Sequence, residues 1–295
     1  MSAKIISGTE IAKQIADEIY HEVVELKARY GVVPGLATVL VGDDPASHVY
    51  VGSKVRTCQN LGIHSERFDL PANTSETELL ALLEKLNNNP QINGILVQMP
   101  LPKHIDEAKI IFAINPDKDV DGFHPISVGR MVIGKPSFLP CTPQGIQVLL
   151  ERSNISTDGA DVVVVGRSNI VGKPIANILL QKALGANATV TICHSATRDI
   201  AAHTRRADIL ISAMGKPHFI TADMLKDGVV VVDVGTNEIG KTTDGKRILV
   251  GDVDFAAVKE KASAITPVPG GVGPMTIIML MSNTINATKI AHGIS

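Results

Sequence analysis

The first third of the chain alternates between segments with a helical repeat of apolar residues and segments that are apolar throughout. Residues 8–30 repeat an apolar side chain every fourth position from Ile11 to Val23, which predicts an amphipathic helix. Residues 35–42 (GLATVLVG) are almost entirely apolar, as in a buried strand. Such strands, when helices join them, indicate a parallel sheet covered on both faces. The same reasoning predicts helices at 45–60 and 76–87 and strands at 63–69 and 92–98.

A second alternating series begins near residue 161 and follows the strand–helix–strand–helix–strand order that a Rossmann-type half requires. Before it, residues 110–145 are rich in Pro, Gly and Asp and lack helical periodicity, which indicates functional loops and a domain junction. After it, a Gly/Pro loop leads into a long helix that starts near Pro274. The second series has strands at 161–165, 188–193, 208–213 and 229–234, and helices at 173–183, 199–205 and 221–226.

The composition excludes several functional classes. A length of 295 residues allows one large or two ordinary domains. Aromatic residues make up 3% and the net charge is −2, so the chain lacks the stacking platforms and basic surface of nucleic-acid-binding proteins. The three cysteines are widely spaced, which argues against a disulfide framework or a metal site. No apolar run is long enough for a signal peptide or a membrane span, so we expect a cytoplasmic protein.

The segment VVVVGRSNIVGKP (162–174) joins a buried strand to a helix through two glycines. Gly166 stands where the strand ends and Gly172 where the helix begins, with Ser168 between them. Glycine lets the backbone approach a pyrophosphate, and the start of a helix supplies free N–H groups and a positive dipole. The spacing differs from GxGxxG, but the strand–turn–helix context favours a dinucleotide-binding turn.

The end of the second strand of this series bears on the choice of nicotinamide cofactor. NAD-binding folds usually place an acid there to hold the ribose hydroxyls, whereas TVTICHSATR (189–198) contains no carboxylate. His194, Ser195 and Thr197 offer imidazole and hydroxyl groups, and Arg167 lies in the first turn. An arginine with hydroxyl partners would pair with a 2′-phosphate, which favours NADP over NAD. The alternative is that Arg167 and Arg198 are solvated loop residues.

Three short segments of the first half carry candidate chemistry. Tyr50 and Lys54 are four residues apart and share one helix face, although a surface pair at this spacing is common. Gln98 ends a buried strand, where sites form in α/β proteins, or else caps a loop. Asp119 and Asp121 flank a turn assisted by glycine, and either could simply be a turn former. Taken one at a time, each of these residues has a structural explanation.

Taken together, these segments resemble the bifunctional methylenetetrahydrofolate dehydrogenase/cyclohydrolase family over nearly the whole chain. The resemblance implies that the protein oxidises 5,10-methylene- to 5,10-methenyl-tetrahydrofolate with a nicotinamide cofactor and then hydrolyses the product to 10-formyltetrahydrofolate. The motifs that carry it, in order, are YVGSK (50–54), GILVQMPLP (94–102), NPDKDVDGFHP (115–125), PCTPQG (140–145), VVGRSNIVGKP (164–174), CHSAT (193–197), DILISAMGKP (208–217) and TPVPGGVGPMT (266–276).

The resemblance also implies roles for individual residues. Lys54 is the expected catalytic group, since burial beside a cationic substrate would lower its pKa and let it relay protons. Gln98 is the expected partner that orients Lys54, with Val97 and Met99 beside it as substrate contacts. Tyr50 is expected to stack on the folate and Asp121 to accept from the pterin ring. The further expected substrate contacts are Pro269, Gly270, Gly271, Val272 and Gly273, and the cofactor contacts are Gly166, Arg167, Ser168, Ser195 and Thr236.

One position departs from the family pattern. Where the family commonly has Asn two residues after FHP, this chain has Ser127, which keeps a hydroxyl but loses the paired donor and acceptor of an amide. This substitution bears on the positioning of the nearby loop and leaves the expected class of activity unchanged.

The expected fold is α/β, with two three-layer domains around a cleft. The first, the folate-binding catalytic domain, comprises residues 1–142 plus 275–295, and the second, residues 143–274, is a Rossmann-type NADP-binding domain. The resemblance also implies a homodimer. Three alternatives remain open: a dehydrogenase without the hydrolytic step, a dehydrogenase of another small substrate such as shikimate, and a nucleotide-sensing module without catalysis.

Overall fold

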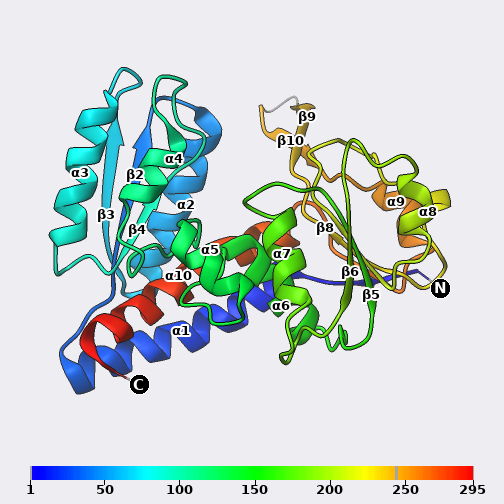
Figure 1. Cartoon of the computed structure of the whole chain (residues 1–295), viewed down its shortest axis with the longest axis horizontal. Helices are drawn as coiled ribbons and strands as arrows, with labels where there is room; N and C mark the ends of the chain where they lie inside the picture. The colour runs from blue at the N-terminus through cyan, green and yellow to red at the C-terminus, as the bar shows by residue number, and fades with distance from the viewer. Residues whose placement is uncertain (1, 243–244, 295) are drawn as a thin grey trace. The chain divides into compact units, whose positions relative to one another are not determined.

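The computed structural model describes residues 2–242 and 245–294 (Figure 1). Its contacts divide the chain into two compact units. The three-stranded unit comprises Gln14–Cys141 and Ile277–Ser295, and the six-stranded unit comprises Met1–Lys13 and Thr142–Thr276. This division differs from the boundaries expected from the sequence at residues 1–13. The cause is that strand β1 (Lys4–Ile5) pairs with β11 (Ala264–Ile265) of the six-stranded unit.

The three-stranded unit is built on a parallel sheet of order β3-β2-β4. Successive side chains of the central strand point to opposite faces, so Ala37, Val39 and Val41 pack on one side against leucines of α3 and Ile110 of α4. On α2, Cys58 Sγ lies 3.4 Å from the sulfur of Met281 in α10. The elements of this unit are β2 (Gly35–Val41), α2 (Pro45–Leu61), β3 (His64–Leu70), α3 (Glu76–Asn88), β4 (Gly94–Val97), α4 (Glu107–Ala113) and α5 (Pro125–Val132).

Local sequence signals explain where the helices of this unit begin and end. The Asp44 side chain accepts from the backbone N–H of Ser47 at 2.8 Å and caps α2, which starts at Pro45. The same helix ends at Gly62, whose φ of 73° is the left-handed conformation that glycine adopts without strain. Ser75 and Glu78 form a reciprocal capping box at the start of α3. These signals set the ends of the helix that carries Tyr50 and Lys54.

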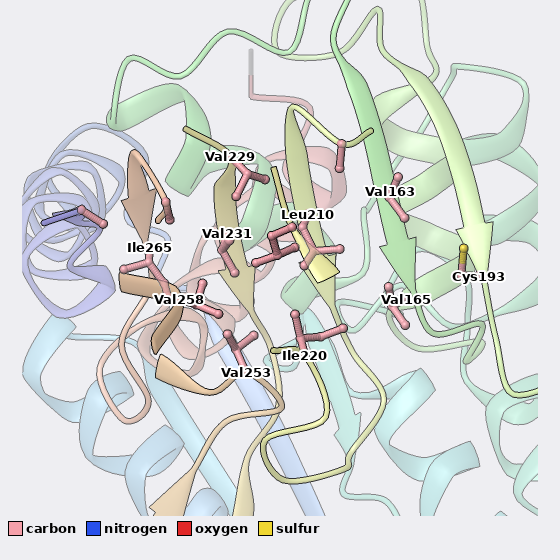
Figure 2. Close-up of a cluster of buried hydrophobic side chains, with 14 residues drawn as sticks. Val163, Val165, Cys193, Leu210, Ile220, Val229, Val231, Val253, Val258 and Ile265 are labelled. Carbon is pink, nitrogen blue, oxygen red and sulfur yellow. The ribbon is translucent and has the colours of Figure 1, made fainter. Parts of the chain in front are cut away.

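The six-stranded unit holds a parallel sheet of order β1-β11-β8-β7-β5-β6. Helices α8 and α9 cover the face with the buried cluster of Figure 2, where Val163, Leu210 and Val231 come from adjacent strands, and α7 packs against β5 and β6. Both units are therefore α/β with parallel sheets, as predicted. The remaining elements of this unit are β5 (Asp161–Val165), α7 (Gly172–Leu179), β6 (Thr189–Cys193), α8 (Ile200–Thr204), β7 (Ile209–Ser212), β8 (Val230–Asp233), β9 (Asn237–Lys241), β10 (Arg247–Val250) and α9 (Phe255–Lys259).

The strand order places a switch point inside this sheet. With β5 as the first strand of the series, β6, β5, β7 and β8 run in the order 2-1-3-4. The chain therefore reverses its direction of winding between β5 and β7. Ligands of open α/β sheets bind at the carboxyl ends of the strands that flank such a point. Here those ends are the turn that begins at Gly166 and the loop that begins at Ala213.

Some helices differ from the pattern expected from the sequence. Residues 110–145 were expected to be loops, yet they contain part of α4, all of α5 and the start of α6 (Cys141–Arg152). Asp106 and His124 cap α4 and α5, which are only 7 and 8 residues long, so too few turns exist for a periodic signal. The helix expected at 221–226 is a single 3-10 turn, η1 (Ala222–Met224).

Two long helices each have residues in both units. They are α1 (Gly8–Tyr30) and α10 (Val272–His292). In the described part of the chain, neither these nor any shorter helix combines the length and apolarity needed to cross a bilayer.

Candidate active site

The three-stranded unit brings Lys54 of α2 against Gln98, the residue that follows β4. Lys54 is 9% exposed, and its Nζ donates to Gln98 Oε1 at 3.0 Å. The Gln98 backbone N–H donates to Val39 at 2.8 Å, and its side-chain Nε2 donates to the carbonyl of Met99 at 2.8 Å. Because the amide nitrogen is engaged with Met99, the amide oxygen is turned toward the lysine. The side chains of Lys54 and Gln98 are therefore in direct contact.

Burial shifts the pKa of Lys54. Removal from water lowers the pKa of its ammonium, and the nearby Asp121 and Cys141 oppose that shift by favouring the charged form. Gln98 accepts from the amine without adding a charge, so it orients Lys54 with little effect on its charge state. A buried amine of lowered pKa, held by a neutral acceptor, can act as a general base.

Asp121 is the charged neighbour of Lys54. Burial raises the pKa of this half-buried carboxyl, while the charge of Lys54 and the nearby Cys141 thiol lower it. By geometry that thiol donates to the Val120 carbonyl at 3.3 Å. The Cys141 thiol itself stays protonated, because burial and the adjacent Asp121 charge raise its pKa well above the usual range. Lys54, Gln98 and Asp121 are thus brought together in one unit, and Cys141 joins them although no role was expected for it.

Asp119 orders the turn that presents Asp121. Its carboxylate oxygens accept from the backbone N–H groups of Phe123 at 3.2 Å and His124 at 2.8 Å. Burial raises the pKa of this 1% exposed carboxyl to about 6, and the backbone hydrogen bonds from His124 and Phe123 lower it in part. The buried hydroxyl of Ser127, where the family commonly has Asn, lies near Asp119 but makes no hydrogen bond, by distance and angle, within the described part of the chain. Of the two candidate carboxylates, Asp119 supports the backbone, and Asp121 is near enough to Lys54 to influence its pKa.

Asn283 of α10 holds two segments of this unit together. Its Nδ2 donates to the carbonyls of Val120 at 2.8 Å and Leu139 at 3.0 Å. The first segment carries Asp121, and the second leads to Cys141. Sequence reasoning missed Asn283, since a polar residue in an apolar helix gives no sign of the partners it will reach.

The other substrate contacts expected in this unit differ in their exposure to solvent. Tyr50 stands one turn before Lys54 on α2 and is 44% exposed, so its ring is accessible to a ligand. Val97 and Met99, in contrast, pack into the cluster formed with the α3 leucines. Val97 is the last residue of β4, whereas Gln98 and Met99 follow the strand, and the Met99 carbonyl accepts from the Gln98 side-chain amide.

The turn after β5 has the close packing expected of a dinucleotide site. Gly166 has a φ of 137°, and a Cβ there would lie 2.3 Å from the Ala213 carbonyl oxygen. A Cβ on Gly172 would lie 2.2 Å from the carbonyl oxygen of Gly166. The Ser168 hydroxyl accepts from the N–H groups of Val171 at 3.1 Å and Gly172 at 3.3 Å. The Ser168 hydroxyl therefore holds the turn that leads into α7, and a side chain at Gly166 or Gly172 would collide with the backbone.

The segment after β6 forms a compact polar turn. Thr197 Oγ1 accepts from the His194 N–H at 2.9 Å, and His194 Nδ1 accepts from the Ala196 N–H at 3.2 Å. These two side chains therefore shape the turn, whereas Ser195 and Arg167 are exposed and accessible to a ligand. Gly166 donates from its N–H to Cys193 at 2.8 Å, so the turns after β5 and β6 are adjacent.

The glycine loop at 269–273 is packed against the start of α1 within the six-stranded unit. The Thr9 N–H donates to the Gly270 carbonyl at 3.1 Å, and a Cβ on Gly8 would lie 1.7 Å from the Gly271 carbonyl oxygen. Gly273 is exposed with open space around it, and Pro269 is also exposed. Val272 is buried as the first residue of α10. The exposed members of the loop are therefore the ones available to a ligand.

A surface cavity of about 750 Å³ lies elsewhere in the six-stranded unit, between residues 151–158 and 182–187. None of its lining residues belongs to the expected site. Its size alone does not make it the active site, since it lies away from the carboxyl ends of the strands where the chemical groups gather.

Comparison with known proteins agrees with the resemblance. Residues 6–121 match the tetrahydrofolate dehydrogenase/cyclohydrolase catalytic domain, and residues 140–292 match the NAD(P)-binding domain of that family. The chain is 67% identical over 294 residues to bifunctional protein FolD of Dehalococcoides mccartyi, covering 100% of this chain and 99% of the relative.

Solved structures agree over the same extent. The bifunctional FolD methylenetetrahydrofolate dehydrogenase/cyclohydrolase of Campylobacter jejuni has a TM-score of 0.92 at 46% identity, covering 98% of this chain and 99% of that one. The FolD of Trypanosoma brucei, complexed with NADP cofactor and an inhibitor, has a TM-score of 0.94 at 38% identity, covering 99% of each chain. The likeness therefore extends over both units.

Proposed function

Because this chain belongs to the tetrahydrofolate dehydrogenase/cyclohydrolase family, we propose that Lys54, Gln98 and Asp121 form its folate-processing centre. The protein is a bifunctional methylenetetrahydrofolate dehydrogenase and cyclohydrolase of one-carbon metabolism. The single observation that supports the proposed centre is the contact between the buried Lys54 amine and the Gln98 amide, with Asp121 beside the lysine.

In the hydrolytic step, Lys54 acts as the proton acceptor. The methenyl bridge is an amidinium-like carbon, to which water adds as one of its O–H bonds breaks. The neutral amine of Lys54 takes that proton, and burial favours this neutral form by lowering the pKa of the ammonium. As the adduct collapses, its hydroxyl loses a proton and becomes the formyl C=O, while the bond to the ring nitrogen breaks and that nitrogen gains a proton. The reaction therefore opens the bridge to the 10-formyl product and releases one proton overall. Gln98 holds the amine in place through both protonation states, because it carries no charge.

Asp121 and Tyr50 would bind the substrate. A carboxylate accepts well from adjacent N–H groups of a pterin ring, and its negative charge also attracts the methenyl cation. The exposed ring of Tyr50, one turn from Lys54, offers a surface for stacking on the aromatic part of the folate. The exposed residues Pro269 and Gly273 are further candidates for contact with it.

The oxidative step uses a nicotinamide cofactor, which we propose is NADP. The turn between Gly166 and Gly172 suits a dinucleotide, since any side chain at either glycine would collide with the backbone. When bound, the cofactor accepts the hydride, and the protein contributes position and electrostatics. Arg167 and Ser195, both exposed, would pair with a 2′-phosphate, and Thr236 would lie toward the nicotinamide. An NADP-complexed relative at 38% identity supports this choice.

The direct test is an assay of the purified protein with methylenetetrahydrofolate and either NADP or NAD. We expect cofactor-dependent formation of methenyl-tetrahydrofolate, followed by its hydrolysis, with NADP preferred. If neither cofactor gave product above background, the proposed sites would be wrong for this chain.

We propose a homodimer on the resemblance alone, and a cytoplasmic location on the composition of the sequence. Sedimentation equilibrium of the purified protein tests the first, because a monomer at micromolar concentration would contradict it. Fractionation of the cells that produce the protein tests the second.

A further inference from the structure

Two buried carboxylates hold the loops at the carboxyl ends of β7 and β8. Asp252 is fully buried, and its Oδ2 accepts from the N–H groups of Met214 at 2.6 Å and Gly215 at 3.1 Å. Its Oδ1 accepts from the N–H of Lys216 at 2.9 Å. Three successive N–H groups of the loop after β7 therefore converge on one carboxylate, which sets the path of that loop.

Asp233, the last residue of β8, holds Asp252 in turn. It is 3% exposed, its Oδ1 accepts from the N–H groups of Gly235 and Asp252 at 3.0 Å, and its Oδ2 accepts from the N–H of Val253 at 3.0 Å. The two aspartates therefore form one network in which the first positions the backbone of the second. Hydrogen bonds to a charged acceptor are roughly twice as strong as those between neutral groups.

Two neighbouring glycines, Gly235 and Gly251, pack so tightly on the two carboxylates that no side chain could replace their hydrogens. A Cβ on Gly235 would lie 2.2 Å from Asp252 Oδ1, and one on Gly251 would lie 1.8 Å from Asp233 Oδ2. Because backbone packs directly on both carboxylates, a displacement of either acid moves the loops themselves.

These loops lie at the edge of the sheet where a dinucleotide binds. The loop after β7 flanks the switch point, and the carbonyl of its first residue, Ala213, contacts Gly166 of the dinucleotide turn. On the loop after β8, Thr236 stands between two groups tied to the network. The Gly235 N–H donates to Asp233, and the Asn237 Nδ2 donates to Asp252 at 3.0 Å.

We infer that Asp233 and Asp252 are positioning residues for the nicotinamide cofactor, which shape residues 214–216 and 235–237 into its binding surface before it arrives. The inference rests on the proposed function of this edge of the sheet. The expected effect is on cofactor affinity, because Lys54, Gln98 and Asp121, which carry the proposed hydrolysis, belong to the three-stranded unit.

The test compares Asp252→Asn and Asp233→Asn with the wild-type full-length protein. Cofactor affinity is measured by titration with NADPH, and KM and kcat are measured for NADP in the dehydrogenase reaction. Hydrolysis of supplied methenyl-tetrahydrofolate without NADP serves as the internal reference. We expect Asp252→Asn to raise the Kd and the KM about tenfold or more, since it leaves loop N–H groups without their acceptor. Hydrolysis should change less than about twofold.

Two further variants make the result decisive. Asp227→Asn alters an exposed aspartate of the same unit, whose side chain is 94% exposed, and should leave the Kd unchanged. Asn237→Ala removes one donor to Asp252 but keeps both acids, and should raise the Kd by about threefold. This milder variant decides the question if Asp252→Asn does not fold.

These measurements distinguish failure of the inference from failure of the proposed cofactor site. Wild-type affinity in both aspartate variants, or in Asn237→Ala where the first fails to fold, would overturn the inference. So would a parallel loss of hydrolysis and cofactor binding, which would mark the acids as supports of the whole fold. A wild-type protein that does not bind NADPH at all would instead count against the proposed cofactor site.

Discussion

The amine of Lys54 donates to the amide oxygen of Gln98 at 3.0 Å, across 44 positions of the chain. One residue lies on α2 and the other follows β4, so their contact depends on how that helix packs on the sheet. Because Gln98 is neutral, it orients the Lys54 amine without changing the charge state of that amine. Replacing Lys54 tests the amine itself, and replacing Gln98 tests the effect of its neutral acceptor.

Replacing Lys54 with Met should abolish hydrolysis of supplied methenyl-tetrahydrofolate. The variant keeps an apolar stem of similar length but removes the amine, and loss of a general base typically costs a factor of about 100 to 10,000. The decay of methenyl absorbance reports the rate. The affinity for NADPH should stay at the wild-type value, since the cofactor turn belongs to the six-stranded unit. Hydrolysis at the wild-type rate would remove Lys54 from the proposed role.

Replacing Gln98 with Glu should move the pH profile of hydrolysis to higher pH. A carboxylate 3.0 Å from the amine favours the ammonium and so raises the pKa of Lys54, which burial lowers in the wild-type protein. Because the reactive form is the neutral amine, the rising limb should shift upward by about one pH unit or more. Gln91→Glu, at an exposed position, is the matched control. An unshifted profile in Gln98→Glu would mean that another group titrates.

Replacing Arg167 with Gln should reduce the preference for NADP. The exposed guanidinium is the proposed partner of the 2′-phosphate, and a hydrogen bond to a charged group contributes about 1.5–3 kcal/mol. We expect kcat/KM with NADP to fall about tenfold or more while that with NAD changes little. Arg198→Gln tests the other exposed arginine of this edge. Equal losses with both cofactors would assign Arg167 to the shared part of the dinucleotide.

Replacing Gly172 with Ala should weaken cofactor binding and destabilise the six-stranded unit. The new Cβ would lie 2.2 Å from the Gly166 carbonyl oxygen, so the turn must open. Overpacking of this kind costs about 1–3 kcal/mol. Gly129→Ala is the matched control, because it lies in α5 with no atom near its Cβ and should stabilise that helix slightly. Thermal unfolding and NADPH titration measure the two effects, and an unchanged Kd in Gly172→Ala would contradict the assigned turn.

The buried Asp119 should make its contribution to the free energy of unfolding decrease as pH rises, whereas a carboxyl of lowered pKa has the opposite effect. Its pKa rises from 3.8 to about 6 on burial, so the folded protein binds more protons than the unfolded chain between about pH 4 and pH 6. The contribution of Asp119 to the free energy of unfolding therefore decreases as pH rises through this window, by about 3 kcal/mol in total. Urea unfolding at several pH values should show a difference between wild type and Asp119→Asn that changes in this sense. A difference independent of pH would contradict the raised pKa.

Much of the fold was predictable because the strands and longer helices repeat their apolar residues over many positions. The strand at 161–165 and the helix at 8–30 were predicted with the bounds observed for β5 and α1. The short helices α4 and α5 were not, since capping by Asp106 and His124 defines them better than periodicity does. The order of strands in the six-stranded sheet was likewise beyond prediction, because parallel strands of similar apolarity can pair in several orders.

For this chain, the sequence alone determined the α/β class, the glycine-bounded turn after β5 and membership of its family, because each depends on residues close together or on motifs in a set order. The tertiary structure decided which polar residues meet. It separated Asp121, which influences the pKa of Lys54, from Asp119, which supports the backbone, and it joined Asp233 to Asp252. Packing brings together residues from distant segments, and burial then sets their pKa values, so neither can be deduced from local pattern.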